Sequence, residues 1–282
     1  MTNGIEDTPA PGGARPAQID DVRATVLSNL TVNDTYRHLV LQAPGPASEA
    51  QAGQFFNMAC SNRVFEDPLL RRPMSVYRAD ANTGIVEFLY KVAGVGTRAL
   101  ALLEPGQKIW ILGPLGKGFS VKPDWNHVVL LGRGVGLATL APLAELASAS
   151  HVSVTVILSA RSPAGIMSVK RFAQAGARVH TVIDSDGSSS PQNVERILRG
   201  LVRDPGVDAF FTCGSSRLML LVQRLGHELG IEGQVALEQQ MACGLGMCFC
   251  CVRYFKSRGI VESRRVCVQG PVFKLEEVMP WT

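Results

Sequence analysis

The first half of the chain, from about residue 21 to 122, reads as short apolar stretches separated by turn residues. The clearest stretch, 84–92, places an apolar side chain at every second position, as in a strand with one buried face. These positions are Val86, Phe88, Tyr90 and Val92. Similar stretches occur at 55–60, 73–77 and 108–112. Many short strands with Gly and Pro between them predict an antiparallel barrel or sandwich.

The pattern changes at about Trp125. Residues 128–132 are continuously apolar, as expected of a strand buried on both faces. Strand-like and helical stretches then alternate, and this alternation predicts a parallel sheet with helices on both faces. The expected strands lie at 152–158, 178–184 and 208–214, and the expected helices near 165–175, 192–202 and 217–230.

The remaining residues, from about Gln234, contain one apolar strand at 234–238 and then many cysteines. Periodicity here is too weak for a separate core, and so small a unit usually needs a metal or a disulfide. The pattern as a whole predicts four parts. They are a flexible tail at 1–20, a barrel at 21–122, an α/β domain at 123–235 and a small C-terminal segment at 236–282.

Composition narrows the class of protein. Hydrophobic residues make up 46% of the chain and charged residues 18%, which is a globular balance. The net charge of +4 is spread without a Lys/Arg-rich run, so no nucleic-acid partner is expected. No apolar run approaches the ~18 residues that a membrane helix needs, and the N-terminus lacks the apolar stretch of a secretory signal. We therefore expect a cytoplasmic protein whose thiols stay reduced.

Four of the seven cysteines follow the spacing C-x4-C-x2-C-x15-C: Cys243, Cys248, Cys251 and Cys267. This is the plant-type spacing of a [2Fe–2S] cluster, which four thiolates hold. A structural zinc site usually shows two C-x2-C pairs, whereas only one is present, and disulfides are disfavoured in a reducing compartment. Cys250 breaks the spacing, and we interpret it as a cysteine that does not bind the cluster.

A glycine-rich turn, Gly132, Gly134 and Gly136, lies between a predicted strand and a predicted helix. Such a turn favours a phosphate at the helix N-terminus, although a turn without a ligand has the same pattern. Cys213 and Gly214 end another strand, where a nicotinamide or simply a buried thiol is expected. Arg161 ends the strand at 152–158 and is placed for an adenosine ribose. Arg161 alone does not decide whether the coenzyme is NADH or NADPH.

Two arginines in RRPMS (71–75) precede a strand of the predicted barrel, and GVGT (94–97) adds a second glycine-rich turn. The planar guanidinium of arginine suits a pyrophosphate, because it donates two parallel hydrogen bonds. The alternative is that these arginines are simply exposed at the edge of the barrel and bind no ligand, since the sequence pattern would be the same.

The motifs LRRPMSVY, FLYKVAGVGT, ILGPLGKGF, VLLGRGVG, MACGLGMCFCCV and RVCVQGPVF occur in this order. In this the chain resembles the electron-transfer subunits of class 1B dihydroorotate dehydrogenases, in the ferredoxin reductase-like superfamily, over residues 21–278. The resemblance implies an FAD-binding β-barrel, a nucleotide-binding α/β domain with Cys213 and Gly214 at the nicotinamide, and four cysteines on [2Fe–2S]. It implies nine FAD-binding residues: Arg72, Pro73, Met74, Ser75, Leu89, Tyr90, Lys91, Gly96 and Thr97.

The same resemblance implies a function. Electrons would pass between NAD(P)(H), FAD and the cluster, to or from an FMN-containing catalytic subunit in a heterotetramer. Three places depart from the family pattern, namely Arg133 in the glycine-rich turn, Ser215 after Cys-Gly, and the loop 184–193. Because of these departures, the second alternative is a reductase that serves a different dehydrogenase or an oxygenase. A zinc-stapled adaptor without catalytic activity is the third alternative.

Overall fold

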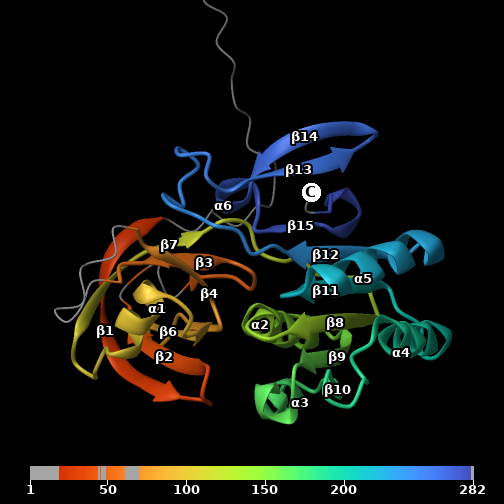
Figure 1. Cartoon of the computed structure of the whole chain (residues 1–282), viewed down its shortest axis with the longest axis horizontal. Helices are drawn as coiled ribbons and strands as arrows, with labels where there is room; N and C mark the ends of the chain where they lie inside the picture. The colour runs from red at the N-terminus through yellow and green to blue at the C-terminus, as the bar shows by residue number, and fades with distance from the viewer. Residues whose placement is uncertain (1–18, 44, 46–48, 61–69, 281–282) are drawn as a thin grey trace, which may run out of the picture.

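The computed structural model describes residues 19–43, 45, 49–60 and 70–280, so the predicted tail lies outside the described residues except at its end. The first part is a curled antiparallel sheet with the strand order β4-β3-β7-β1-β2-β6-β5 (Figure 1). Its strands are β1 (Asp20–Thr31), β2 (Tyr36–Gln42), β3 (Phe55–Met58), β4 (Arg72–Ser75), β5 (Arg78–Asp80), β6 (Ile85–Lys91) and β7 (Lys108–Leu115). The short helix α1 (Val95–Ala101) follows β6.

Alternation along β6 produces the core of this sheet, because every second side chain of a strand points to the same face. Val86, Phe88 and Tyr90 are buried there, as the pattern predicts. Phe88 meets Phe56 of β3 edge to face, with ring centroids 5.8 Å apart. Leu89 points the other way but is also buried, because it packs against the second domain. The outer face of β6 is therefore covered at Leu89, partly covered at Ile85 and Glu87, and exposed at Lys91.

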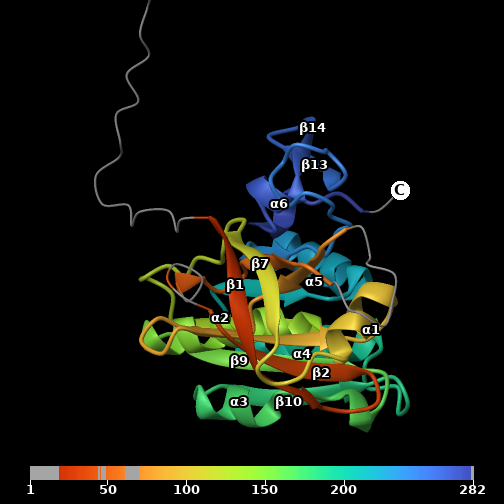
Figure 2. The same ribbon diagram turned by 90° about the vertical axis from the view of Figure 1, so that its left-hand side faces the viewer.

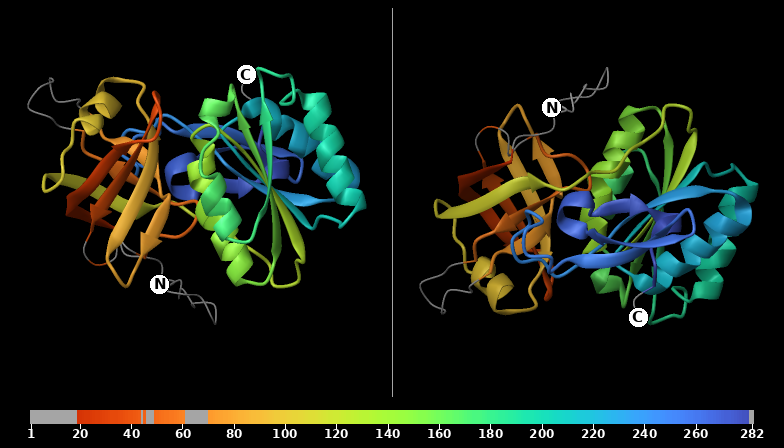
Figure 3. Two further views of the ribbon diagram at one scale, coloured as in Figure 1. Left: turned by 90° about the horizontal axis from the view of Figure 1, so that it is seen from below. Right: turned by 90° about the horizontal axis from the view of Figure 1, so that it is seen from above.

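The second part is a sheet of order β10-β9-β8-β11-β12-β15, whose first five strands are parallel. Helices cover both of its faces (Figure 3). The parallel strands are β8 (His127–Arg133), β9 (Ser153–Ala160), β10 (Arg178–Ile183), β11 (Ala209–Cys213) and β12 (Glu232–Ala236). The α-helices are α2 (Gly136–Ala149), α3 (Val169–Gln174), α4 (Pro191–Arg203) and α5 (Ser216–Leu229). The predicted combination of an antiparallel barrel and a parallel α/β sheet is thus confirmed, the barrel taking the form of the curled sheet.

The helix expected near 165–175 is shorter in the structure. A 3₁₀ turn, η2 (Pro163–Gly165), comes first, and α3 begins only at Val169. Three residues separate the two, and the last of them, Ser168, has a φ of 64° in the left-handed region that a helix cannot include. The other helices follow local signals. Ser190 caps α4, and Ser215 caps α5 by accepting a hydrogen bond from the Leu218 N–H.

The C-terminal segment packs on the parallel sheet and has no core of its own. It consists of a hairpin of β13 (Val252–Ser257) and β14 (Ile260–Arg265), then α6 (Val266–Gln269), β15 (Val272–Lys274) and the 3₁₀ turn η3 (Leu275–Glu277). β15 pairs with β12 and adds an antiparallel sixth strand. The ring of Phe255 lies 4.3 Å from that of Phe273, within the core that α5 covers. Figure 2 shows the hairpin standing above both sheets.

Direct contacts join the curled sheet to the α/β sheet. Asn33 donates a hydrogen bond to the Ala164 carbonyl at 3.0 Å, and the hydroxyl groups of Tyr77 and Ser168 are 3.0 Å apart. The Arg171 guanidinium lies 4.0 Å from the centre of the Tyr77 ring. These contacts set the width of the cleft between the two sheets. Among the residues described, no helix has the length and apolarity needed to cross a bilayer.

Candidate functional site

The glycine-rich turn and the Cys213-Gly214 pair meet at the point where the strand order of the parallel sheet reverses. β8 and β11 are neighbours there, with Gly132 opposite Cys213. The backbones touch, since a Cβ atom on Gly214 would lie 2.1 Å from the Arg133 carbonyl oxygen. Open α/β sheets bind their ligands at such a reversal, beyond the carboxyl ends of the strands. The structure therefore brings together two motifs that lie far apart in the sequence.

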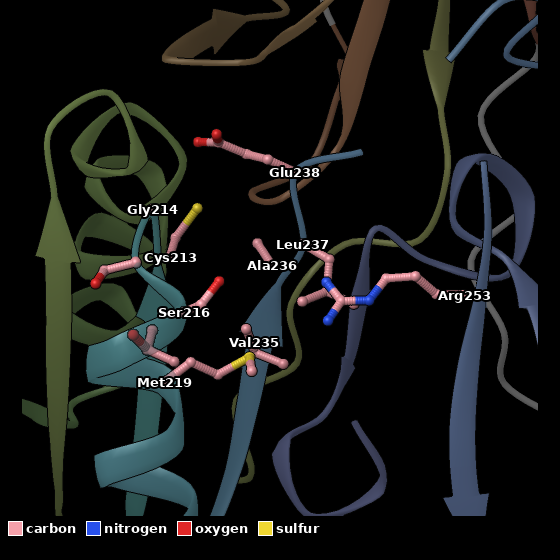
Figure 4. Close-up of a pocket in the computed structure, with 11 residues that line it drawn as sticks. Cys213, Gly214, Ser216, Met219, Val235, Ala236, Leu237, Glu238 and Arg253 are labelled. Atoms are coloured by element: carbon pink, nitrogen blue, oxygen red, sulfur yellow. The ribbon is translucent and has the colours of Figure 1, made fainter. Parts of the chain in front are cut away.

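Cys213 is buried at this point, 3% exposed. Burial raises the pKa of its thiol, and so does the nearby Glu238 carboxylate, whereas a hydrogen bond with Thr139 opposes them. A neutral thiol at the edge of a cleft is a packing surface and not a nucleophile. Figure 4 shows Cys213 and Gly214 across a small cavity from Val235 and Leu237. The cavity has a volume of about 210 Å³.

A larger cavity of about 490 Å³ runs between the two sheets along the carboxyl ends of β8 and β9. Gly134 and Arg161 line it, as does Gly214. The curled sheet closes the opposite side with Tyr36, whose hydroxyl would lie 3.1 Å from a Cβ on Gly134. Gly132 and Gly136 flank the turn, Gly132 within β8 and Gly136 at the start of α2. The position of the glycine-rich turn at the cavity wall, just before α2, fits a dinucleotide with its pyrophosphate on the turn.

A third cavity, of about 260 Å³, lies between β4, β6 and the C-terminal segment. Six of the nine residues predicted to bind FAD line it: Pro73, Met74, Ser75, Leu89, Tyr90 and Lys91. Val135 of the glycine-rich turn and Thr139 of α2 line the opposite wall. A flat ring bound here would lie between the nucleotide turn and the cysteine segment.

The two arginines of RRPMS have different partners. Arg71 forms a two-pronged ion pair with Asp21, with both N–O distances at 2.8 Å. Both arginines line a cavity of about 970 Å³, and Arg72 also packs against the turn that begins α1. A Cβ on Gly96 would lie 2.7 Å from the Arg72 Nε atom, so any larger residue there would displace the Arg72 side chain. Thr97 fastens the turn by accepting hydrogen bonds from the N–H groups of Ala93 and Gly94.

The four spaced cysteines form two pairs. The sulfur atoms of Cys251 and Cys267 are 3.2 Å apart, and the backbone N–H and the thiol of Cys248 both help to lower the pKa of Cys243. Over the described part of the chain, no three Cys, His, Asp or Glu side chains gather around one point as ligands of a single ion do. A cluster of two irons needs two thiolates on each iron, and the two pairs fit this need.

Backbone N–H groups point at these sulfurs. Leu245 N lies 3.3 Å from the Cys243 sulfur, and Cys267 N lies 3.4 Å from the Cys251 sulfur. Partial burial raises the Cys243 pKa, but donors on Cys248, Leu245 and Met247 outweigh it and lower the pKa to about 6. N–H groups directed at thiolates stabilise their negative charge and tune a bound cluster.

Cys250 faces away from both pairs. It is exposed and lines the cavity of about 970 Å³ opposite Arg72 and Pro73. Its neighbour Cys251 is buried in the core beneath the hairpin. Adjacent residues thus point to opposite sides, one toward the sulfur pairs and one toward the cleft. Cys60, the remaining cysteine, is buried inside the curled sheet, and its pKa is raised to about 11 by that burial.

The sequence patterns missed Glu238, which lies at the centre of the site. Its carboxyl lines all four cavities named above, just after the end of β12. Solvent reaches it through those cavities, yet the surrounding protein raises its pKa, with Lys91 acting in the opposite sense. The sequence did contain a signal for this residue. An acidic residue that follows an apolar strand of a parallel sheet lies where such sheets bind ligands.

Comparison with known proteins shows which family the chain resembles. The model of the family described as the iron–sulfur cluster binding domain of dihydroorotate dehydrogenase B matches residues 238–279. The chain is 31% identical over 260 residues to the dihydroorotate dehydrogenase B (NAD(+)), electron transfer subunit, of Shouchella clausii. That match covers 91% of this chain and 97% of the relative. The subunit of the same name from Desulforamulus reducens is 30% identical, with the same coverage of both chains.

Solved structures show the same fold. The structure of an NADH-dependent reduced ferredoxin-NADP oxidoreductase, described for flavin-based electron bifurcation, superposes with a TM-score of 0.77 at 26% identity. The superposition covers 91% of this chain and 90% of that one. The cytochrome P450 reductase of Amycolatopsis superposes with a TM-score of 0.60 at 22% identity, over 78% and 69% of the two chains.

Proposed function

Because the chain belongs to the family of electron transfer subunits of dihydroorotate dehydrogenase B, we propose that it carries electrons between NAD(H) and a partner flavoenzyme. FAD and a [2Fe–2S] cluster are the carriers between them. In this proposal residues 21–122 hold the flavin, 123–235 the dinucleotide and 236–282 the cluster.

One observation carries the proposal, namely that the three candidate sites are contiguous. The cavity along β8 and β9 shares Val135, Lys91 and Glu238 with the cavity lined by the predicted FAD residues. That cavity in turn shares Gln239 and Met241 with the cavity that contains Cys250, next to the paired cysteines. An electron carrier needs such an order, since the nicotinamide, the flavin and the cluster must lie in sequence.

The residues present fit a flavin. Tyr90 and Leu89 provide an apolar wall, Ser75 and Lys91 provide polar groups, and Arg72 is placed for a pyrophosphate. When bound, a flavin accepts two electrons as a hydride equivalent and releases them one at a time. Cys213 and Gly214 close the nicotinamide side, where the neutral thiol excludes water without reacting. Lys91 and Glu238 provide opposite charges at the same rim.

The residues present also fit a [2Fe–2S] cluster. Cys243 and Cys248 would bind one iron, and Cys251 and Cys267 the other, as the observed pairs indicate. Such a cluster carries one electron at a time. Gly244 and Gly246 have positive φ angles of 73° and 77°, which let the loop turn back on itself between the first two cysteines.

The outer side of the cysteine loop supports a partner surface. Leu245, Met247 and Phe249 are 43%, 78% and 61% exposed, and they flank Cys248. Exposed apolar side chains next to a redox centre are typical of a docking surface. We propose that the catalytic subunit, which we expect to bind FMN, docks here in a cytoplasmic heterotetramer.

Purification from the native source tests the proposal. The expected product shows flavin and iron–sulfur absorbance, contains two irons with acid-labile sulfide per chain, and is bleached by NADH under anaerobic conditions. It co-purifies with an FMN-containing chain that oxidises dihydroorotate. A colourless protein with one zinc would contradict the proposal. A coloured protein bound to a different dehydrogenase or to an oxygenase would contradict the partner but keep the relay.

A further inference from the structure

Arg133 has a position in the glycine-rich turn that suggests a phosphate contact, but its guanidinium points elsewhere. It extends sideways across the carboxyl ends of the parallel strands to Asp184, the residue after β10. The two Arg133 nitrogens Nη2 and Nη1 lie 2.6 and 3.1 Å from the two carboxylate oxygens of Asp184. Nη1 also donates to Ser159 Oγ at 2.8 Å. The arginine side chain is 18% exposed, so this arrangement is a packed one.

The sheet register produces this arrangement. Arg133 is paired with Ser159 between β8 and β9, and Ala160 is paired with Ile183 between β9 and β10. The three strand ends are therefore level, and a long side chain from the first can reach the residue that follows the third. The two-pronged geometry is the strongest that arginine forms with a carboxylate. It occupies both terminal nitrogens of the guanidinium.

Asp184 is held from several sides. Ser189 donates its hydroxyl to the carboxylate, and the Arg217 guanidinium lies 3.9 Å away. The Arg133 and Ser189 hydrogen bonds lower the pKa of Asp184 to about 2, so it stays charged at any physiological pH. Asp186, two residues later, bonds within its own loop to Ser188. Of these two carboxylates, Asp184 is therefore the one that fixes the position of the Arg133 guanidinium.

Arg133 lines the dinucleotide cavity beside Gly134, Ala160 and Arg161. In a doubly wound sheet this end of the cavity takes the adenosine ribose. NADPH differs from NADH by a phosphate on that ribose, and arginine is the residue that accommodates it. When both terminal nitrogens of an arginine bind a carboxylate, they are not available to bind a phosphate. The carboxylate also repels a second anion at the same place.

We infer that Asp184 is a positioning residue that makes the site select NADH over NADPH by holding Arg133 away from the 2′-position of the ribose. The inference rests on the proposed function, and it adds the residue that decides between the two coenzymes. Release of Arg133 would place it next to Arg161, and two guanidinium groups would then face a 2′-phosphate.

The test compares the binding of 2′,5′-ADP and of 5′-ADP to the purified protein by calorimetry, which needs no catalytic turnover. We expect Asp184→Asn to tighten 2′,5′-ADP binding at least tenfold and to change 5′-ADP binding less than threefold. In the loaded protein, the ratio of kcat/KM for NADPH to that for NADH should rise by at least the same factor. Most of the rise should come from a lower KM for NADPH. Asp184→Ser is a second variant in case the amide disturbs the loop.

Two matched variants separate this inference from its alternatives. Asp186→Asn removes a charge from the same loop without releasing an arginine, and it should leave the ratio within twofold of the wild type. Arg133→Ala combined with Asp184→Asn should lose the gain for 2′,5′-ADP. An unchanged ratio in Asp184→Asn and Asp184→Ser, or an equal gain in Asp186→Asn, would overturn the inference. Failure of both NADH and NADPH to reduce the wild type would instead overturn the proposed function, and the nucleotide-binding result would still decide the role of Asp184.

Discussion

The sulfur atoms of Cys251 and Cys267 lie 3.2 Å apart, although the two residues are 16 positions apart in the chain. The hairpin of β13 and β14 spans that distance and returns the chain, since Val252 is paired with Arg265. Both cysteines are buried beneath it, 2% and 1% exposed. Cys243 and Cys248 form the other pair on an accessible loop. A cluster held this way has one side in the core and one side toward the solvent, where a partner can approach.

Cysteine substitutions test the assignment of the ligands. We expect Cys251→Ser to lose most of the iron and acid-labile sulfide, because it removes one sulfur of the buried pair. Cys250→Ser should retain both, because the Cys250 side chain faces the cleft and not the sulfurs. Iron and sulfide analysis together with the visible spectrum measure the outcome. Equal iron content in the two purified variants would show that the ligands are wrongly assigned.

Glu238→Gln should raise the thermal midpoint at neutral pH. The protein atoms around Glu238 raise the pKa of its carboxyl in the folded state, although solvent reaches it, so the folded state holds its proton to a higher pH than the unfolded chain does. Between the two pKa values the folded state binds more protons, and stability therefore falls as pH rises. The amide has no charge that the surrounding protein atoms disfavour. The gain should be present at pH 8 and absent at pH 4, as scanning calorimetry would measure, and a gain of equal size at both pH values would contradict this cause.

Gly214→Ala should destabilise the protein by about 1–3 kcal/mol, through a clash with the backbone. A Cβ there would lie 2.1 Å from the Arg133 carbonyl oxygen, at a φ of +91°. Gly206→Ala is the matched control, since its φ is +97° but nothing lies within 4 Å. Denaturant unfolding of both variants separates the clash from the cost of a positive φ. Equal losses in the two would show that the contact between β8 and β11 carries no special cost.

Met247→Glu should weaken binding to the catalytic subunit at least about tenfold, because apolar side chains near the centre of an interface dominate its binding energy. Met247 is 78% exposed, so its replacement should leave folding, iron content and reduction by NADH unchanged. Leu30→Glu is the control, since Leu30 is 61% exposed on β1 of the curled sheet, away from the cysteine loop. Surface plasmon resonance with the partner measures both. Equal affinity of the two variants would place the partner elsewhere.

Local patterns were sufficient for most of the elements. Alternation predicted β6, and continuous apolar runs predicted β8 and the parallel strands, because the pattern of side chains reports which faces are buried. They failed at α3, where a single left-handed residue, Ser168, delays the start of the helix. They also treated Leu89 as an outward residue, because a packed second domain is not visible in the periodicity of one strand.

The sequence by itself determined the two kinds of sheet, the spacing of the four cysteines and the motifs that carry the family resemblance. Each of these depends on residues near one another in the chain. Only the tertiary structure decided which distant groups meet. It separated Arg71, bound to Asp21, from Arg72, and it turned Arg133 toward Asp184. It also placed Glu238 where four cavities meet. These outcomes depend on strand order, register and the packing of two domains, which long-range contacts set and local side-chain patterns do not encode.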